Sequence, residues 1–485
     1  MKTLHKLITA SFLILPPMKL LSSWTLIATV LFAASALLLP PTISCAQKIS
    51  GGGQHSFSIC IDSTAMSWGD NYNGVLGNGN NTDSNVPVQV SSLTGATAVA
   101  GGQYHALAVK NDGTAWAWGY NAVGQLGNGT NTASNVPVEV SGLTGITAIA
   151  GGNEHSLALK NDGTVWAWGE NFSGELGNGN NTNSNVPVQV SGLTGITAIA
   201  AAYLNSLALK DDGTVWAWGA GSAGQLGNGT NIDVNIPVQV SSLTGIIDIA
   251  AGNDLSLALK NDGTVWAWGT NQYGTLGNGN NTDSNVPVQV NSLTDMIAIG
   301  GGSYHCLALK NDGTVWAWGF NSSGQLGNGN NISSNVPWQV YSLTGVIEIA
   351  GGDQHSLALK SDGTVWTWGW NLYGQLGNGN NTASNIPVEV TGLCQGATSV
   401  NEIAEPLSIS VFPNPATNHF SIAFASSNKK VEVTITDITG KIIYTTTASE
   451  TEMLEVNLKD FTEGVYVVRI QTSDFVRSVR LIVTK

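Results

Sequence analysis

The sequence predicts an all-β protein in which a closed ring of repeats is followed by a small antiparallel β-sandwich. Three observations support this prediction. One 50-residue unit recurs seven times from Gly51 to about residue 396, with no insertion or deletion between copies. Only 10% of the 485 residues are charged and 59 are Gly, which is typical of a turn-rich β protein. From Leu407 onward the repeat stops, and a second set of alternating apolar segments begins.

The residues before the first repeat have the pattern of an export signal. A lysine precedes an apolar run at residues 24–39, and small residues follow the run. This pattern predicts a signal peptide over residues 1–46, with Met18 as an alternative start. A membrane anchor is the competing interpretation, but the run is shorter than the roughly 20 apolar residues that a spanning helix needs. Cys45 raises a lipoprotein alternative that its neighbours fit poorly, so we expect cleavage and a mature form that does not span a membrane.

Each repeat predicts four short strands. In the third copy, Asn-Asp-Gly at residues 161–163 forms a hairpin turn, and Trp166 and Trp168 share one face of the strand that follows because the strand period is two. Pro187 opens the fourth strand, where no ladder donor is lost. Four short strands per unit are typical of a propeller blade. The predicted strands of this copy are residues 147–150, 155–160, 164–169 and 187–190.

Seven such blades predict a closed ring over residues 47–396. Open stacks need polar end repeats, whereas the first and last copies here keep the apolar pattern, and rings of four to eight blades are known. The sequence leaves open whether residues 47–50 pair within the first blade or with the last one. Cys60, Cys306 and Cys394 would remain after cleavage. A disulfide between Cys60 and Cys394 is one alternative, but buried free thiols are the favoured interpretation.

The repeat motif resembles a known family. The string Gly-Gly-x-x-His-Ser-Leu-Ala-Leu, then Asp-Gly-Thr-Val-Trp-Ala-Trp-Gly, then Asn-x-x-Gly-Gln-Leu-Gly-Asn-Gly is similar to the regulator of chromosome condensation repeat. The resemblance covers all seven copies and implies a seven-bladed β-propeller. The eukaryotic founder acts on a nuclear GTPase and chromatin, an activity that an export signal and an acidic body argue against here. Secreted bacterial members include inhibitors that clamp a β-lactamase, which implies a protein-binding role.

The segment at residues 407–485 predicts a small antiparallel sandwich. Phe-Pro-Asn-Pro at 412–415, a Gly-Lys turn at 440–441, Gly-Val-Tyr at 464–466 and a closing basic and apolar strand resemble the C-terminal sorting domain of type IX secretion cargo. The resemblance implies that this domain engages the type IX secretion machinery, and that the protein is secreted or held at the outer cell surface. A plain adhesive sandwich is the alternative. We interpret residues 397–406 as a linker.

The charge of the repeats excludes one class of partner. Residues 51–396 contain 22 acidic residues, six Lys and no Arg, a net charge of −16. Such a surface repels phosphate backbones, so we expect no nucleic-acid binding.

The repeated histidines and the Asn-rich loops could be metal or catalytic sites, but a structural role is the favoured interpretation of both. Five copies carry a His at one position, which a metal ring or a catalytic cluster would use. A structural hydrogen bond from each imidazole to the backbone is the favoured interpretation, because strict repetition is what packing demands. The Gly-Asn-Gly-Asn-Asn loops resemble calcium loops, but the second and seventh copies have no Asp there. We therefore expect no metal, no cofactor, no catalytic residue and no enzymatic activity. The histidines are His55, His105, His155, His305 and His355.

The differences between copies concentrate at repeat positions 3–5 and at positions 20, 22 and 23, counted from Gly51. These positions open the second strand and close the third, so in an antiparallel hairpin they lie at one end. Seven of the ten Tyr residues are among them. We call this end of the ring the variable face. Its aromatic residues are Tyr72, Tyr104, Tyr120, Phe172, Tyr203, Tyr273, Tyr304, Phe320, Trp370 and Tyr373, and its acidic residues are Asp70, Glu154, Glu170, Asp254 and Asp353.

A uniform scaffold with an aromatic-rich variable end is typical of a recognition surface. We therefore expect an exported propeller that binds a protein or glycan partner through the variable face, with the aromatic residues of the sixth, seventh, first and second copies forming a contiguous arc. Neutral drift of exposed loops explains the variation but not the aromatic excess. The alternatives are a secreted lyase or hydrolase with a site at the propeller centre, and a purely architectural surface protein.

Overall fold

The computed structural model describes residues 46–394 and, toward the C-terminus, residues 409–412, 416–424, 431–437, 441–448, 453–459, 461–471 and 476–483. The chain divides into two compact units, Met1–Gly396 and Ala397–Lys485. The predicted signal peptide, apart from Ala46, and the predicted linker at 397–406 lie outside the described residues.

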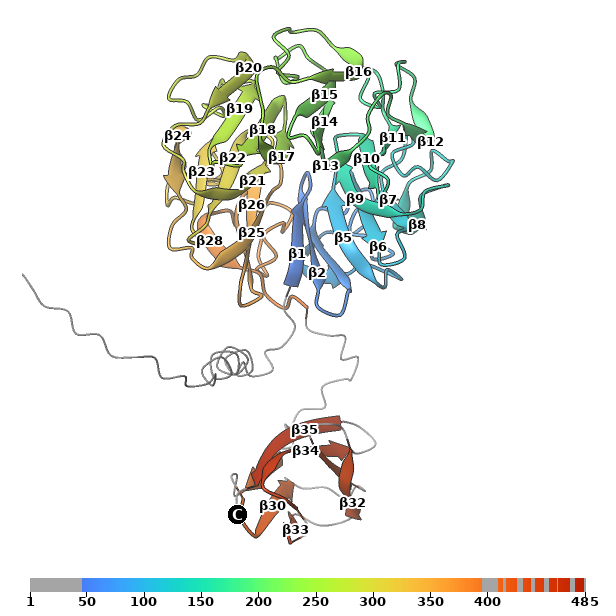
Figure 1. The fold of residues 1–485 in the computed structure, drawn as a ribbon, viewed down its shortest axis with the longest axis vertical. Helices are drawn as coiled ribbons and strands as arrows, with labels where there is room; N and C mark the ends of the chain where they lie inside the picture. The colour runs from blue at the N-terminus through green and yellow to red at the C-terminus, as the bar shows by residue number, and fades with distance from the viewer. Residues whose placement is uncertain are drawn as a thin grey trace, which may run out of the picture. The chain divides into compact units, whose positions relative to one another are not determined.

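The first unit is a ring of seven antiparallel sheets, each of four strands (Figure 1). Sequence order is spatial order within each sheet, so every blade is a simple meander from the ring centre outward. The innermost strands are β1 (Ala46–Gly51), β5 (Ala96–Gly101), β9 (Ile146–Gly151), β13 (Ile196–Ala201), β17 (Ile246–Gly252), β21 (Met296–Gly301) and β25 (Val346–Gly351). The second strands are β2 (His55–Cys60), β6 (His105–Lys110), β10 (His155–Lys160), β14 (Asn205–Lys210), β18 (Leu255–Lys260), β22 (His305–Lys310) and β26 (His355–Lys360). The third strands are β3 (Ala65–Gly69), β7 (Ala115–Gly119), β11 (Val165–Gly169), β15 (Val215–Gly219), β19 (Val265–Gly269), β23 (Val315–Gly319) and β27 (Val365–Gly369). The outermost strands are β4 (Ser84–Gln89), β8 (Ser134–Glu139), β12 (Ser184–Gln189), β16 (Val234–Gln239), β20 (Ser284–Gln289), β24 (Ser334–Gln339) and β28 (Ser384–Glu389).

Four strands per repeat and the all-β propeller are confirmed, but the predicted start of the fourth strand is wrong. In the third blade this strand, β12, begins at Ser184, and Pro187 lies inside it. The register against β11 shifts between Ala167 and Gly169. Proline is tolerated because β12 is an edge strand next to a bulge, where a missing backbone N–H costs little.

Blade-to-blade packing makes the apolar core. Trp168 of β11 is fully buried and packs in one cluster with Leu107 and Leu126 of the preceding blade. Its indole Nε1 also donates to the backbone oxygen of Gln125 at 2.8 Å. Each blade therefore completes the core of its neighbour and cannot bury its apolar face alone.

The ring closes through the same contacts that join the other blades. The first strand β1 pairs with β2 of its own blade, which answers the question that the sequence left open. Trp68 of the first blade donates to the backbone oxygen of Gln375 in the seventh at 2.9 Å, as Trp168 does to Gln125. The backbone N–H of Gly379 donates to the oxygen of Asn85 at 2.9 Å. Among the described residues, each blade is built from four consecutive strands, and no strand is exchanged between the ends of the ring.

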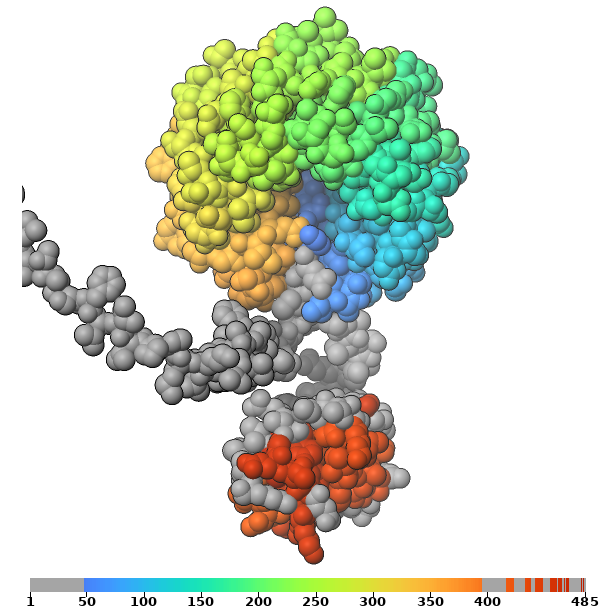
Figure 2. All heavy atoms as spheres, in the orientation of Figure 1, coloured from blue at the N-terminus to red at the C-terminus, as the bar shows by residue number. Residues whose placement is uncertain are grey.

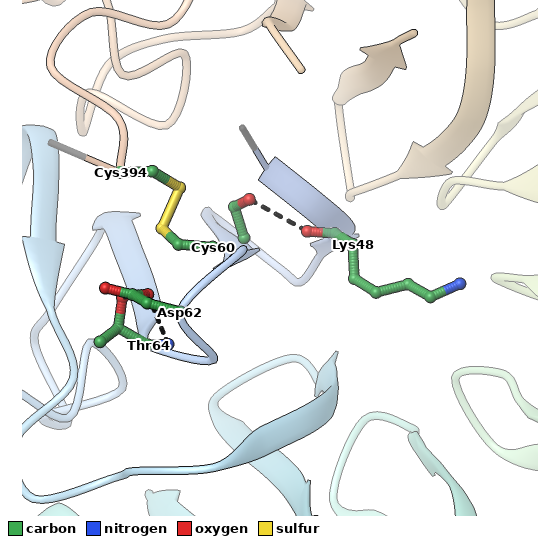
Figure 3. Close-up of a disulfide and its surroundings, with 6 residues drawn as sticks. Lys48, Cys60, Asp62, Thr64 and Cys394 are labelled. Carbon is green, nitrogen blue, oxygen red and sulfur yellow. Dashed lines mark hydrogen bonds between the residues drawn. A yellow bond between two sulfur atoms is a disulfide. The ribbon is translucent and has the colours of Figure 1, made fainter. Parts of the chain in front are cut away.

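A disulfide spans the closing junction, and the favoured interpretation of Cys60 and Cys394 as free thiols is wrong. Cys60 ends β2, Cys394 follows β28, and their Cα atoms are 5.4 Å apart (Figure 3). The two residues are 334 positions apart in sequence, and only ring closure makes them neighbours. Cys306 is a buried free thiol, as expected.

The second unit contains two sheets over one core. The sheets have the orders β29-β30-β33 and β32-β31-β34-β35. Phe420 and Val456 of the first sheet pack with Val433 and Val468 of the second in one buried cluster. This arrangement is the predicted small antiparallel sandwich. Its strands are β29 (Ile409–Phe412), β30 (His419–Phe424), β31 (Val431–Asp437), β32 (Ile442–Ala448), β33 (Met453–Asn457), β34 (Gly464–Gln471) and β35 (Val476–Val483).

Candidate recognition surface

The hairpin geometry gathers the variable positions at one end of each blade. The backbone N–H of Tyr120 donates to the oxygen of Tyr104 at 2.9 Å, and that of Phe320 donates to Tyr304 at 2.8 Å. The same bond joins Glu170 to Glu154 in the third blade. Repeat positions 4 and 20 are therefore direct neighbours across the second and third strands.

The aromatic residues form three separate groups on the variable face. The largest bridges the fifth and sixth blades, where the ring centroid of Tyr273 lies 5.5 Å from Tyr304 and 4.6 Å from Phe320. The second blade holds Tyr104 against Tyr120 at 6.2 Å. The third group, Trp370 against Tyr373 at 5.7 Å, belongs to the seventh blade.

Other aromatic residues stand apart from these groups. Tyr72 and Phe172 are 79% and 70% exposed. Neither ring contacts another ring in the described part of the chain. Tyr203 is 37% exposed and lies at the ring centre. The aromatic surface is thus distributed around the ring, and its largest group includes a fifth-blade residue outside the arc expected from the sequence.

The middle of the variable face is a polar hollow of about 130 Å³. Figure 2 shows the opening at the centre of the ring. Asp353 organises one side, where its carboxylate accepts hydrogen bonds from Ser303 Oγ at 2.6 Å and Gln103 Nε2 at 2.7 Å. Burial raises the pKa of Asp353. The side chains at repeat position 3 that line the hollow are Gln103, Asn153, Tyr203, Asn253, Ser303 and Asp353.

Three carboxyl groups of the third blade, those of Glu154, Glu170 and Glu175, lie close enough for their charges to interact. Burial raises the pKa values of Glu154 and Glu170, and the charge of Glu154 adds to the effect on Glu170. Glu175 is fully buried, and burial raises its pKa to about 7. Glu170 Oε2 and Glu175 Oε1 are buried and have no hydrogen-bond partner among the described residues.

Sequence reasoning missed Glu175. It occupies repeat position 25, where four other copies carry Gln. Those glutamines accept a backbone N–H, as Gln125 does from Val123 at 3.1 Å, and Glu175 accepts the equivalent bond from Ser173 at 3.0 Å. A comparison of the copies at this internal position would have found it.

Sequence reasoning also missed Asp248, which lies on the innermost strand β17 at a position where most copies have Ala. Burial raises its pKa to about 6. Its side chain accepts the backbone N–H of Ile249 at 2.9 Å and that of Ile299 at 3.4 Å. The second bond crosses to the next blade, which gives Asp248 a structural role at the blade junction.

Four of the five repeated histidines bond through Nε2 to a serine side chain of the next blade, so the bond to backbone expected for them is wrong. His105 Nε2 lies 2.9 Å from Ser156 Oγ of the next blade. Ser156 Oγ itself donates to the backbone oxygen of Gln125 at 2.9 Å, so it accepts from the imidazole N–H. Burial lowers the pKa of His105 to about 3 and keeps the ring neutral.

The six repeated lysines of residues 51–396 lie at the opposite end of the ring. Lys160 ends β10 beside the hairpin turn, and its Nζ is 3.5 Å from Asp162. The same pair, with N to O distances of 3.0–3.9 Å, recurs in the second to seventh blades. Within the described residues of the ring, the acidic groups of the variable face therefore lie away from these lysines.

Two further findings on the described residues concern metal binding and the membrane. No group of three or more His, Cys, Asp or Glu side chains among them is arranged to hold a metal ion. No helix in the same part of the chain is long and apolar enough to cross a membrane.

The comparisons with protein families match both units. The models are the RCC1-like domain at residues 183–411, the regulator of chromosome condensation (RCC1) repeat at 65–109, 112–159, 96–125 and 146–175, and the secretion system C-terminal sorting domain at 410–484. The sorting domain supports secretion or display at the outer surface. A search of curated proteins found no match.

Solved structures show the same fold. Human WBSCR16 is 25% identical with a TM-score of 0.62, over 68% of this chain and 94% of that one. Prp20p from Saccharomyces cerevisiae is 23% identical with a TM-score of 0.61, over 67% and 85%. Yeast RCC1 (Prp20) in complex with Kap60 is 21% identical with a TM-score of 0.61, over 72% and 85%. The chain is therefore a propeller of regulator of chromosome condensation repeats joined to a secretion system C-terminal sorting domain.

Proposed function

We propose that this protein is exported and binds a partner protein through the variable face. One observation carries the proposal. The seven blades are nearly uniform, yet their differences gather at one end, where seven Tyr residues lie among acidic groups. Surfaces rich in Tyr and Trp supply large contact areas at low entropic cost, which is typical of protein recognition.

The aromatic side chains are available for contact. Tyr104, Tyr203 and Tyr72 are exposed, and the rings of Phe320 and Trp370 are partly exposed. None of them belongs to the blade core, which is built from the fully buried Trp at repeat position 18. Prp20p, a propeller of the same fold, has binding properties to Gsp1p and histones, so this fold is associated with protein partners.

Binding is preferred to catalysis because the buried acids nearest the ring centre are engaged by the chain itself. Asp353 accepts from Ser303 and Gln103, and Asp248 accepts from two backbone amides. A glycan partner remains an outcome of the test below.

The proposal is tested by affinity capture with the exported protein, read by mass spectrometry and on a glycan array. We expect one protein partner, and we expect its capture to be lost when Tyr120, Tyr304, Phe320 and Trp370 are all changed to Ala. Buried aromatic anchors of an interface commonly cost about 2 kcal/mol or more when truncated. The melting temperature should change little, because these rings lie outside the core.

The matched control is a second four-site variant away from the variable face. Ile247, Ile297 and Ile347 are 54–57% exposed near the lysine end, and Trp338 is 56% exposed on the outermost strand β24. Their replacement by Ala should leave capture intact. Retained capture by the aromatic variant, or equal loss in both variants, would reject the variable face as the binding surface.

A further inference from the structure

We propose that the partner is basic, and that one of its Lys or Arg side chains seats against Glu154 and Glu170 beside Tyr203 at the centre of the variable face. This inference rests on the proposed function and adds the chemistry of the partner.

The distribution of charge points to a basic partner. All six lysines of residues 51–396 lie at the opposite end of the ring, and each pairs with an Asp two residues further on. The same residues contain no Arg. Among the described residues of the ring, the acids of the variable face therefore have no repeated lysine beside them, and the field there favours a positively charged surface.

The acidic charge of the variable face is concentrated in the third blade. The backbone N–H of Glu170 donates to the oxygen of Glu154 at 2.8 Å, which makes the two residues neighbours at the end of the hairpin. The charge of Glu154 adds to the cost of ionising Glu170, and Glu170 in turn adds to the cost of ionising Glu175. A cation placed among them would relieve this repulsion.

Two carboxyl oxygens of this cluster have no hydrogen-bond partner among the described residues. Glu175 is fully buried, and its Oε1 has no partner among the described residues. Glu170 Oε2 is also buried and has no partner among these residues. The unpaired Oε1 of Glu175 has counterparts in the Nε2 atoms of Gln125, Gln325 and Gln375, so it is a property of the repeat and does not bear on the partner. Buried acceptors are normally satisfied, so the unpaired Oε2 of the half-buried Glu170 indicates a missing donor. A guanidinium carries five donors and an ammonium carries three, and either could supply it.

Tyr203 provides the adjoining apolar contact. It lies at the hollow and is 37% exposed, and the charges of Tyr104, Asp353, Glu154 and Glu170 all act on its hydroxyl. A cation over a tyrosine face is attracted by the ring quadrupole. The nearby aromatic groups extend well beyond one side chain, so a polypeptide fits this surface better than a free small cation.

The test measures binding of three ten-residue probe peptides to the full-length exported protein by fluorescence anisotropy. The peptides alternate Gly with Arg, with Lys or with citrulline, which keeps the shape of Arg but has no charge. We expect the Arg and Lys peptides to bind, the citrulline peptide to bind at least about tenfold more weakly, and the difference to shrink at high salt. Equal binding of the Arg and citrulline peptides would overturn the proposal.

The decisive variant is E154Q/E170Q, compared with E139Q/E389Q. Both double variants remove two negative charges, but Glu139 and Glu389 are exposed on the outermost strands β8 and β28. We expect E154Q/E170Q to weaken Arg-peptide binding about tenfold or more and the control to change it less than threefold. Equal effects would show diffuse attraction and reject the site. Thermal melting checks that both variants fold, and Tyr203→Ala gives a second variant with the same expected loss.

The two proposals fail in different ways. Capture of a partner that survives the four aromatic substitutions rejects the variable face and the proposed function. A partner that is lost with the aromatic variant but is acidic, or is retained by E154Q/E170Q, rejects only the basic-partner inference.

Discussion

The pair of His in one blade with Ser in the next shows how single residues join the ring. It is complete at four of the seven junctions: His105 to Ser156, His155 to Ser206, His305 to Ser356 and His355 to Ser56. At the other three junctions, one or both of these two residues are replaced. Leu255 faces Cys306, an apolar exchange on both sides, whereas His55 faces Ala106 and its Nε2 has no partner among the described residues. Replacing both partners of a buried hydrogen bond by apolar groups costs little stability. Replacing only one leaves the other buried without a hydrogen bond, which destabilises the folded state.

The Gly before this His has a steric reason. A Cβ on Gly152 would lie 2.3 Å from the ring of His155, and one on Gly352 would lie 2.1 Å from His355. The fourth copy has Ala202 at this position together with the shorter Asn205. The repeated Gly-Gly-x-x-His motif is thus explained by packing.

Restoring the missing serine should stabilise the first junction. In A106S the new hydroxyl would accept from His55 and donate to the backbone oxygen of Val75, which already accepts from Trp118. We expect a gain of about 1 kcal/mol in the free energy of unfolding, measured by urea denaturation. The reciprocal variant S206A strands His155 and should lose a similar amount. A loss of stability in A106S would contradict this account of the pair.

Glu175 should make stability depend on pH. Burial, with smaller additions from Glu170 and Asp233, raises its pKa from 4.5 to about 7. The folded state then holds a proton that the unfolded state releases, so its contribution to stability is full below about pH 4.5 and is lost as pH rises through 7. E175Q should therefore be more stable than the wild type at pH 8, by up to about 3 kcal/mol, and much less so at pH 5. The exposed control E139Q should show no such difference, and a pH-independent effect of E175Q would refute the assignment.

At the scale of elements, each blade depends on its neighbours at three levels. The indole of the third strand donates to the preceding blade, the His and Ser pair links the second strands, and an Asn pair links the outer loops. The last link joins Asn135 Nδ2 to Asn81 Oδ1 at 3.0 Å and recurs around the ring to Asn85 and Asn381. The long Asn-rich loops are therefore held by side-chain hydrogen bonds, as turn chemistry predicted.

The disulfide adds a covalent link only at the closing junction. Cys60 and Cys394 enclose 334 positions, so the bond restricts the unfolded chain strongly, and its removal typically costs about 2–5 kcal/mol. C60S/C394S should fold, because the Trp68 and Asn85 contacts persist, but should melt at a lower temperature than the wild type. Thermal melting with and without a reductant measures this: the wild type should be sensitive and the variant insensitive. C306S serves as the control, and a wild type unaffected by reduction would exclude a stabilising role.

At the scale of the whole molecule, the two units perform different tasks. The ring has its own core and the sandwich has another, with no shared cluster among the described residues. The sorting domain supports export, and the propeller carries the proposed binding surface. A disulfide in the ring fits an oxidising compartment, which agrees with export.

Removing the sorting domain should stop export at the outer membrane. A chain ending at Pro406 keeps the complete ring and its disulfide, so it should fold. We expect it to accumulate in the periplasm, with the full chain outside as the control, measured by immunoblots of cell fractions. Normal amounts of the truncated protein in the medium would contradict a sorting role for the tail.

The sequence by itself determined the architecture of this protein. A strict 50-residue period, with strand-length alternation and a turn in every copy, predicts seven equal blades because local structure follows local pattern. The same period placed the variable residues at one end of every hairpin, since strand pairing relates positions that are near in sequence. The sandwich followed from alternation in the same way.

Only the tertiary structure decided the contacts that cross between blades. The disulfide joins residues 334 positions apart, and the His and Ser partners are 51 apart, so neither pairing could be derived from one repeat. Burial of Glu175 and the grouping of Tyr273 with Tyr304 and Phe320 likewise depend on the neighbouring blade. These features depend on how the copies pack around the ring axis. The pattern of a single repeat does not specify which side chains of neighbouring blades come into contact.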